Sequence, residues 1–221
     1  MILKPKKVTT KFEYPLDPDN QTMASYEAPI YSRDYKGDPR AQILPATTLF
    51  QYPFPKGTAI RCDQSFDGLN SSISESDRTH TGLEAFAVDF SMPIGTQVCA
   101  AREGIVVEVI SNFADYSQDP YSPIESDKGR ENKIKILHSD NTYSTYAHIK
   151  QNSSRVTVGR KVAIGDIICL SGHNGYSTGP HLHFEVSKSN DEGKFQTLEF
   201  SFNDGHGNPI TPQVGTSYTR I

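Results

Sequence analysis

Two histidines separated by one residue stand in an apolar run, His181-Leu182-His183-Phe184-Glu185. Successive side chains of a β-strand point to opposite faces, so His181 and His183 share one face while Leu182 and Phe184 face the opposite layer. Two imidazoles on one face can share a metal site or flank one. The alternative is a strand with two hydrogen-bonded histidines on a solvated face.

Further ligands for such a site lie upstream. Catalytic zinc typically takes three protein ligands, His and carboxylate, and keeps a fourth position for water. His80 and Asp89 supply a histidine and an acid. Asp89 lies in the apolar run 85–90, where an ionised carboxylate needs a partner to offset its desolvation. A metal ion would serve as that partner; the alternative is an Asp that caps the turn before Pro93.

Four more histidines complete the set. His148 ends an apolar strand-like run, where it either belongs to the centre or is a half-buried histidine with no role. His173 lies in the glycine-rich approach to the HxH strand and is ambiguous. His138 is expected at a hairpin turn and His206 in a surface loop.

The elements that must position these residues are predicted to be short strands. Period-2 alternation and β-branched runs between turn signals indicate strands, and no stretch keeps helical periodicity for three turns. The sequence therefore predicts a mostly β protein, an antiparallel β-sheet or sandwich core with long surface loops and little helix. The clearest candidate strands lie at 104–110, 133–138, 142–148 and 165–170.

The composition changes along the chain at about residue 55. Residues 1–55 are rich in Pro, Asp, Lys and Thr, which predicts an N-terminal extension with short strands packing on a main β-rich domain, 56–221. Whether this extension masks the site as a latency segment stays open. Two polar stretches, 69–78 and 111–131, predict long loops that are either disordered or form walls of a binding groove.

Composition also excludes some classes of function. A formal charge of −4 without a clustered basic stripe argues against nucleic-acid binding. No segment approaches the roughly 18 apolar residues of a transmembrane span, and the N-terminus lacks the apolar core of a signal peptide. No CxxC pair indicates a thiolate zinc site. The three cysteines, Cys62, Cys99 and Cys169, are expected to be free buried thiols. A disulfide that involves Cys62 is left open.

Five blocks in one order resemble the lysostaphin-type (LytM-like) zinc endopeptidases, in their peptidoglycan-acting branch. The resemblance covers roughly residues 50–187 and continues more weakly over 195–218. The blocks are Asp89–Thr96, Ala100–Val106, Tyr146–His148, Val158–Gly165 and Gly172–Glu185.

The resemblance implies one catalytic Zn²⁺ held by His80, Asp89 and His183. It also implies that His148 and His181 are catalytic and flank the reacting water and the oxyanion. Glu185 shares the strand face of His181 and His183, and is either an orienting group for an imidazole or an ordinary strand carboxylate. One feature departs from the family pattern. Eight residues separate His80 from Asp89, where the common spacing is three, and the short spacing would place the histidine at Ala85.

The function implied by the resemblance is zinc-dependent hydrolysis of peptide cross-links in bacterial cell-wall peptidoglycan, in the periplasm or outside the cell. Zinc would lower the pKa of water to about 7, and two histidines suit proton transfer at neutral pH. The alternative of another class is a catalytically inactive module that binds or activates another cell-wall hydrolase. A third is a secreted protease acting on glycine-rich proteins.

Overall fold

β-Strands form nearly all of the regular structure in the computed structural model, which describes residues 44, 47–66, 79–117, 124–189 and 195–221. The helical elements of this part are two single-turn 3-10 helices, η4 (Gly82–Glu84) and η5 (Glu125–Asp127). The predicted mostly β fold is confirmed. The same part contains no helix long and apolar enough to cross a membrane.

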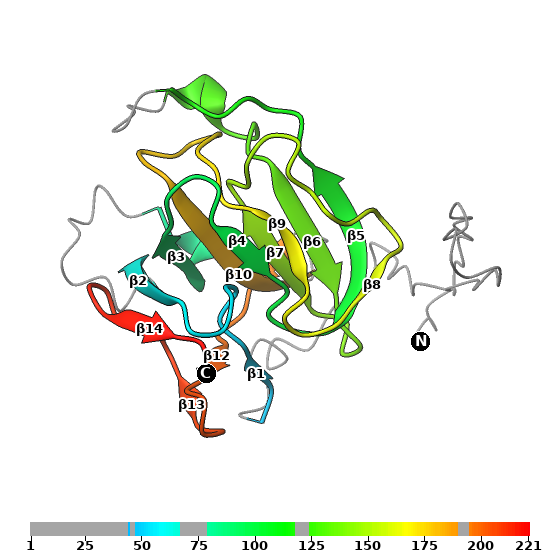
Figure 1. The fold of residues 1–221 in the computed structure, drawn as a ribbon, viewed down its shortest axis with the longest axis vertical. Helices are drawn as coiled ribbons and strands as arrows, with labels where there is room; N and C mark the ends of the chain where they lie inside the picture. The colour runs from blue at the N-terminus through cyan, green and yellow to red at the C-terminus, as the bar shows by residue number, and fades with distance from the viewer. Residues whose placement is uncertain (1–43, 45–46, 67–78, 118–123, 190–194) are drawn as a thin grey trace, which may run out of the picture.

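A curled, nine-stranded sheet dominates the described part of the chain (Figure 1). Its strand order is β14-β2-β3-β10-β7-β6-β5-β8, and β11 pairs with β10 on the side opposite to β7. All of these pairings are antiparallel. The strands are β2 (Ala59–Gln64), β3 (Ala87–Ser91), β5 (Gly104–Ile110), β6 (Lys133–Leu137), β7 (Tyr143–Ala147), β8 (Lys161–Val162), β10 (His181–Ser189), β11 (Phe195–Thr197) and β14 (Ser217–Thr219).

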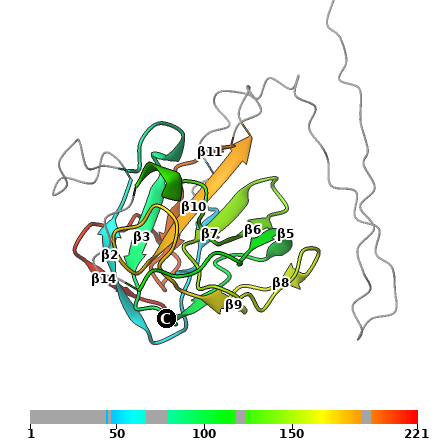
Figure 2. The same cartoon turned by 90° about the horizontal axis from the view of Figure 1, so that it is seen from above.

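Two smaller sheets accompany it. β4 (Gln97–Cys99) and β9 (Ile167–Leu170) form an antiparallel pair that lies across the large sheet in Figure 1. β1 (Leu49–Phe50) runs parallel to β12 (Ser201–Asn203), which pairs with β13 (Pro209–Ile210). Figure 2 shows β10, the longest strand, passing between β3 and β7. The central position of β10 gives it a neighbour on each side.

β10 separates a core face from a polar face, as the alternation of its sequence predicts. Leu182, Phe184 and Val186 are fully buried, whereas His181, His183 and Glu185 keep partial exposure on the other face. Phe184 lies edge-on to several aromatic rings at centroid distances of 5.2–6.1 Å. This aromatic cluster stabilises the sheet with the geometry that rings prefer; its members around Phe184 include Phe50, Tyr146, Phe200 and Phe202.

The predicted strands agree closely with the observed ones. The expected strand 104–110 coincides with β5, and the three others contain β6, β7 and β9. All three cysteines are free and buried, so Cys62 forms no disulfide. The polar stretch 69–78 lies outside the described residues.

The proposed boundary between residues 55 and 56 stays a prediction. Most of the expected extension lies outside the described residues. In its described end, β1 pairs with β12, and Phe50, Tyr52 and Phe54 are buried in the aromatic core.

His138 lies at the β6–β7 hairpin, as expected, but it is buried inside a polar network. Its Nδ1 is 2.7 Å from the Glu103 carbonyl and its Nε2 is 3.0 Å from Ser144 Oγ. The Ser144 hydroxyl donates onward to Tyr146 Oη, which accepts the Ala101 N–H at 2.7 Å. The chain of hydrogen bonds joins β7 to Ala101, two residues after β4, so it ties two sheets together.

The burial of His138 makes acid stability depend on this residue. Burial lowers the pKa of His138 to about 4, whereas an unfolded histidine titrates near 6.5. The unfolded state therefore binds the extra proton first, and the free energy of unfolding falls as the pH drops from 6.5 toward 4, by about 3 kcal/mol from this group. Urea unfolding of metal-free protein at pH 7 and pH 4.5 should show a smaller pH-dependent loss for His138→Gln than for wild type. Equal losses would contradict the assignment.

Candidate metal centre

The register of β10 against β3 brings Asp89 beside the HxH pair. His183 pairs directly with Asp89, and their flanking partners on the core face are Leu182 with Phe90 and Phe184 with Val88. Directly paired residues point to the same face of a sheet, so the carboxylate and the imidazole meet on the polar face. A one-residue slip would turn Asp89 into the core. The buried apolar partners therefore enforce the pairing that the site needs.

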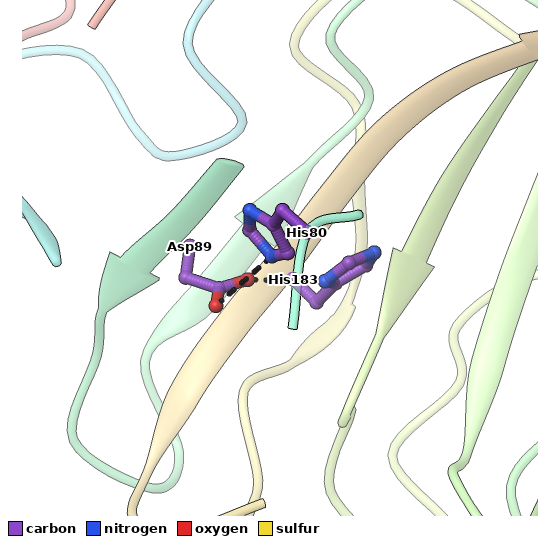
Figure 3. A group of neighbouring side chains, drawn as sticks. All are labelled: His80, Asp89 and His183. Carbon is purple, nitrogen blue, oxygen red and sulfur yellow. Dashed lines mark hydrogen bonds and ion pairs between the residues drawn. The ribbon is translucent and has the colours of Figure 1, made fainter. Parts of the chain in front are cut away.

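His80, Asp89 and His183 converge on one point (Figure 3). One potential ligand atom from each lies within 4.8 Å of the others. His80 Nε2 is 3.2 Å from Asp89 Oδ2, and His183 Nδ1 is 3.0 Å from Asp89 Oδ1. The carboxylate thus lies between two imidazoles, which is a donor set of the kind that holds zinc at open catalytic sites.

The hydrogen bonding of His80 indicates whether this donor set fits a cation. Its Nδ1 lies 3.1 Å from the Ser65 carbonyl, which can only accept, so Nδ1 carries the hydrogen. When the ring is neutral, Nε2 then directs a lone pair toward Asp89, and among the described residues this buried atom has no hydrogen-bond partner. Two lone pairs facing each other repel unless a proton or a metal ion lies between them. The three residues therefore fit a divalent cation.

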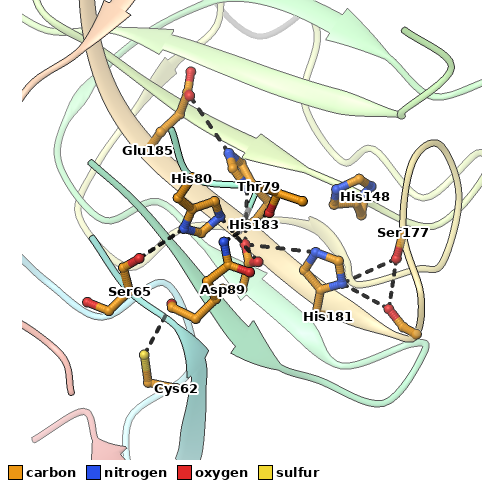
Figure 4. A network of polar contacts seen from close by, with 12 residues as sticks. Cys62, Ser65, Thr79, His80, Asp89, His148, Ser177, His181, His183 and Glu185 are labelled. Carbon is orange, nitrogen blue, oxygen red and sulfur yellow. Dashed lines mark hydrogen bonds and ion pairs between the residues drawn. The ribbon is translucent and has the colours of Figure 1, made fainter. Parts of the chain in front are cut away.

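His183 lies between two carboxylates. Its Nδ1 contacts Asp89, and its Nε2 is 3.7 Å from Glu185 Oε2 (Figure 4). Burial alone would lower its pKa, but the hydrogen bonds and charges of Asp89 and Glu185 raise the pKa of His183 to about 10. Burial alone would raise the pKa of Asp89, but His80, His181 and His183 hold that pKa well below its usual range. The polar face is therefore arranged for positive charge.

His148 and His181 form a second pair beside this cluster. Their ring centroids are 4.6 Å apart, and His181 Nε2 is 3.8 Å from Asp89 Oδ1. His181 Nδ1 donates to the Gly179 carbonyl at 2.8 Å and His148 Nδ1 to the Asn174 carbonyl at 2.6 Å. Burial, with the nearby His181 and His183, holds the pKa of His148 well below its usual value. With hydrogen on Nδ1, the neutral form of each ring keeps Nε2 as the proton acceptor.

A groove opens beside the cluster. Its volume is about 660 Å³, and both Asp89 and His181 line it. Its remaining walls come from the end of β2, the end of β3 with the segment after it, and the turn before β10, namely Asp63, Gln64, Ser91, Pro93, Ile94 and Thr178–Pro180. A cavity of this size next to convergent polar groups is the usual form of a binding site.

The long spacing between His80 and Asp89 is accommodated locally. The intervening chain forms the single turn η4, and Thr197 of β11 holds both sides of it. Thr197 Oγ1 donates to the Leu83 carbonyl at 3.0 Å and accepts the Phe86 N–H at 3.0 Å. The turn brings His80 back over the sheet to Asp89. The structure thus brings together all five predicted site residues; their roles stay predictions.

Sequence reasoning missed the residues that hold His148. Asn174 supplies the carbonyl that accepts from His148, and Asp115 and Asn132 bind the Asn174 side chain. Neither a periodicity nor a motif marks Asp115 within the polar stretch 111–131. Part of that stretch, 118–123, lies outside the described residues. His206 is exposed, as expected for a surface loop, and His173 is buried within the glycine-rich approach to β10.

Several known proteins are similar to this chain in sequence. An uncharacterized metalloprotease of Buchnera aphidicola subsp. Baizongia pistaciae is 33% identical over 65% of this chain and 32% of its own length. Peptidoglycan DD-endopeptidase ShyA of Vibrio cholerae is 39% identical over 60% of this chain and 26% of its own length. Lysostaphin of Staphylococcus staphylolyticus is 32% identical over 60% of this chain and 26% of its own length.

The chain thus spans between 26% and 32% of the length of these relatives. Residues 84–195, about half of the chain, match Peptidase family M23. The matched range begins just after His80 and contains Asp89, His148, His181 and His183. This agrees with the resemblance to lysostaphin-type peptidases found in the five sequence blocks. The chain belongs to Peptidase family M23.

Proposed function

We propose that this chain is a zinc-dependent endopeptidase that hydrolyses peptide cross-links of bacterial cell-wall peptidoglycan, in the periplasm or outside the cell. The observation that carries the proposal is the His80/Asp89/His183 cluster, with the His148/His181 pair and a groove beside it. The names of two relatives, a peptidoglycan DD-endopeptidase and lysostaphin, support this choice of substrate.

His80, Asp89 and His183 are the residues that would hold the ion. Two neutral imidazoles and one carboxylate leave a bound divalent ion with net positive charge. When bound, zinc supplies Lewis acidity toward a carbonyl oxygen and lowers the pKa of water. Three protein ligands also leave room for water or substrate, which distinguishes catalytic zinc sites from closed structural ones.

The His148/His181 pair supplies proton transfer in this proposal. Each ring donates Nδ1–H to a backbone carbonyl, which fixes its orientation and leaves Nε2 to accept a proton. One ring takes the proton from the attacking water at Nε2. The other stabilises the oxyanion of the tetrahedral intermediate by hydrogen bonding after its own Nε2 has taken a proton from solvent, because the neutral Nδ1–H ring has no hydrogen to donate there. The groove along Asp63, Pro93 and Ile94 would hold the peptide on the accessible side of His181.

Digestion of purified peptidoglycan tests the proposal. The zinc-loaded chain should release soluble muropeptides, a chelator should stop the release, and added zinc should restore it. A glycine-rich protein, incubated in parallel, should be cut more slowly than peptidoglycan. Zinc-loaded protein that binds peptidoglycan without cutting it would contradict the proposal and favour the inactive binding module. Preferential cutting of the glycine-rich protein would favour a general secreted protease.

A further inference from the structure

His148 occupies an unusual backbone position for a proton-transfer residue. It directly follows β7 and has a positive φ of 59°. This left-handed conformation is costly for a residue other than Gly and persists only where the surroundings impose it. Its Nδ1 lies 2.6 Å from the Asn174 carbonyl oxygen. Since a carbonyl only accepts, this contact selects the tautomer with hydrogen on Nδ1 and a lone pair on Nε2.

The Asn174 carbonyl is held in place by the Asn174 side chain. That side chain is buried, with a residue exposure of 1%. Its Oδ1 accepts the Asn132 N–H at 2.8 Å, and its Nδ2 donates to the Ile149 carbonyl at 2.8 Å and to Asp115 Oδ1 at 3.0 Å. Ile149 follows His148 directly. Asn174 therefore binds the imidazole through its carbonyl and the adjacent backbone through its side-chain amide.

Asp115 joins three segments around this amide. Besides Asn174, its Oδ1 accepts the His173 N–H at 2.8 Å, and its Oδ2 accepts the Gln151 N–H at 3.1 Å. Gly172 permits the close approach, because a Cβ there would collide with Asp115 and lie 2.6 Å from Lys150 Cα. One carboxylate thus connects the loop after β5, the glycine-rich turn and the chain that follows His148.

We propose that Asp115 and Asn174 are positioning residues that hold His148 in the Nδ1–H tautomer, with Nε2 available for proton transfer. The expected effect on turnover rests on the proposed function, whereas the effect on the tautomer does not. Asp115 belongs neither to the metal cluster nor to the groove lining. Its replacement should therefore disturb the imidazole without removing a ligand or a substrate contact. Loss of a residue that orients a catalytic side chain in this indirect way typically lowers activity about 10- to 100-fold.

The test compares Asp115→Ala and Asp115→Asn with Asp140→Asn in the full zinc-loaded chain. Asp140 is a matched control, because it also accepts three hydrogen bonds, from Thr142 N, Thr142 Oγ1 and Arg102 Nη1, at the β6–β7 hairpin. Nitrogen-15 NMR of the imidazoles gives the tautomer of His148. Zinc content and the KM and kcat for a soluble cross-linked muropeptide complete the measurements.

Asp115→Ala should show a mixture of His148 tautomers and a kcat lowered about 10- to 100-fold, with KM and zinc content unchanged. Asp115→Asn should lose less, and Asp140→Asn should match wild type. A wild-type His148 signature in Asp115→Ala, or an equal loss in Asp140→Asn, would overturn the inference. If Asp115→Ala does not fold, Asp115→Asn decides by the same criteria. If wild type cuts no muropeptide, the proposed function fails, while the NMR comparison still decides the positioning role.

Discussion

Replacement of Asp89 by Asn is expected to abolish zinc binding and hydrolysis together. Asp89 contacts His80 through one carboxylate oxygen and His183 through the other. The amide keeps the size of the side chain but removes the only negative charge of the proposed ligand set. We expect the affinity for zinc to fall by at least about 100-fold, the upper end of what outer-shell changes cost. Zinc stoichiometry after dialysis and muropeptide release measure the two effects.

Asp63→Asn is the matched control for this experiment. Asp63 lines the same groove but lies outside the His80/Asp89/His183 cluster, and its carboxylate pairs with Arg61 at 2.6 Å. It should retain stoichiometric zinc. Because Asp89 is also paired in the metal-free protein, urea unfolding of both variants must show a folded chain. Retention of one tightly bound zinc by folded Asp89→Asn would refute the assigned ligand set.

Replacement of His181 or His148 by Ala is expected to lower hydrolysis strongly without loss of zinc. The chain should keep its zinc, since neither residue belongs to the ligand cluster, yet hydrolysis should fall by about 10²- to 10⁴-fold, the usual contribution of acid–base catalysis. Zinc content and initial rates on the same muropeptide separate this pattern from that of Asp89→Asn. The exposed His206, changed to Ala, should leave both quantities unaltered. Near-wild-type turnover by His181→Ala would refute its catalytic role.

Local pattern was sufficient for the strands and for the assignment of side chains to the two faces of β10. Alternation in residues 181–185 predicts that His181 and His183 share a face, and the structure buries Leu182 and Phe184 on the other. This works because the side-chain period of a strand is a local property of the backbone. Alternation and β-branched runs between turn signals likewise marked β5 and the β6–β7 hairpin without any knowledge of strand order.

The sequence by itself determined the residue types of the centre, the faces of the strands that carry them, and the resemblance to one peptidase family. Only the tertiary structure decided that Asp89 pairs with His183, because register between distant strands depends on packing of the core face. It also decided how η4 returns His80 to the sheet, and that Asp115 and Asn174 hold His148. Such hydrogen bonds join segments 26 to 59 residues apart, and no periodicity along the chain encodes them.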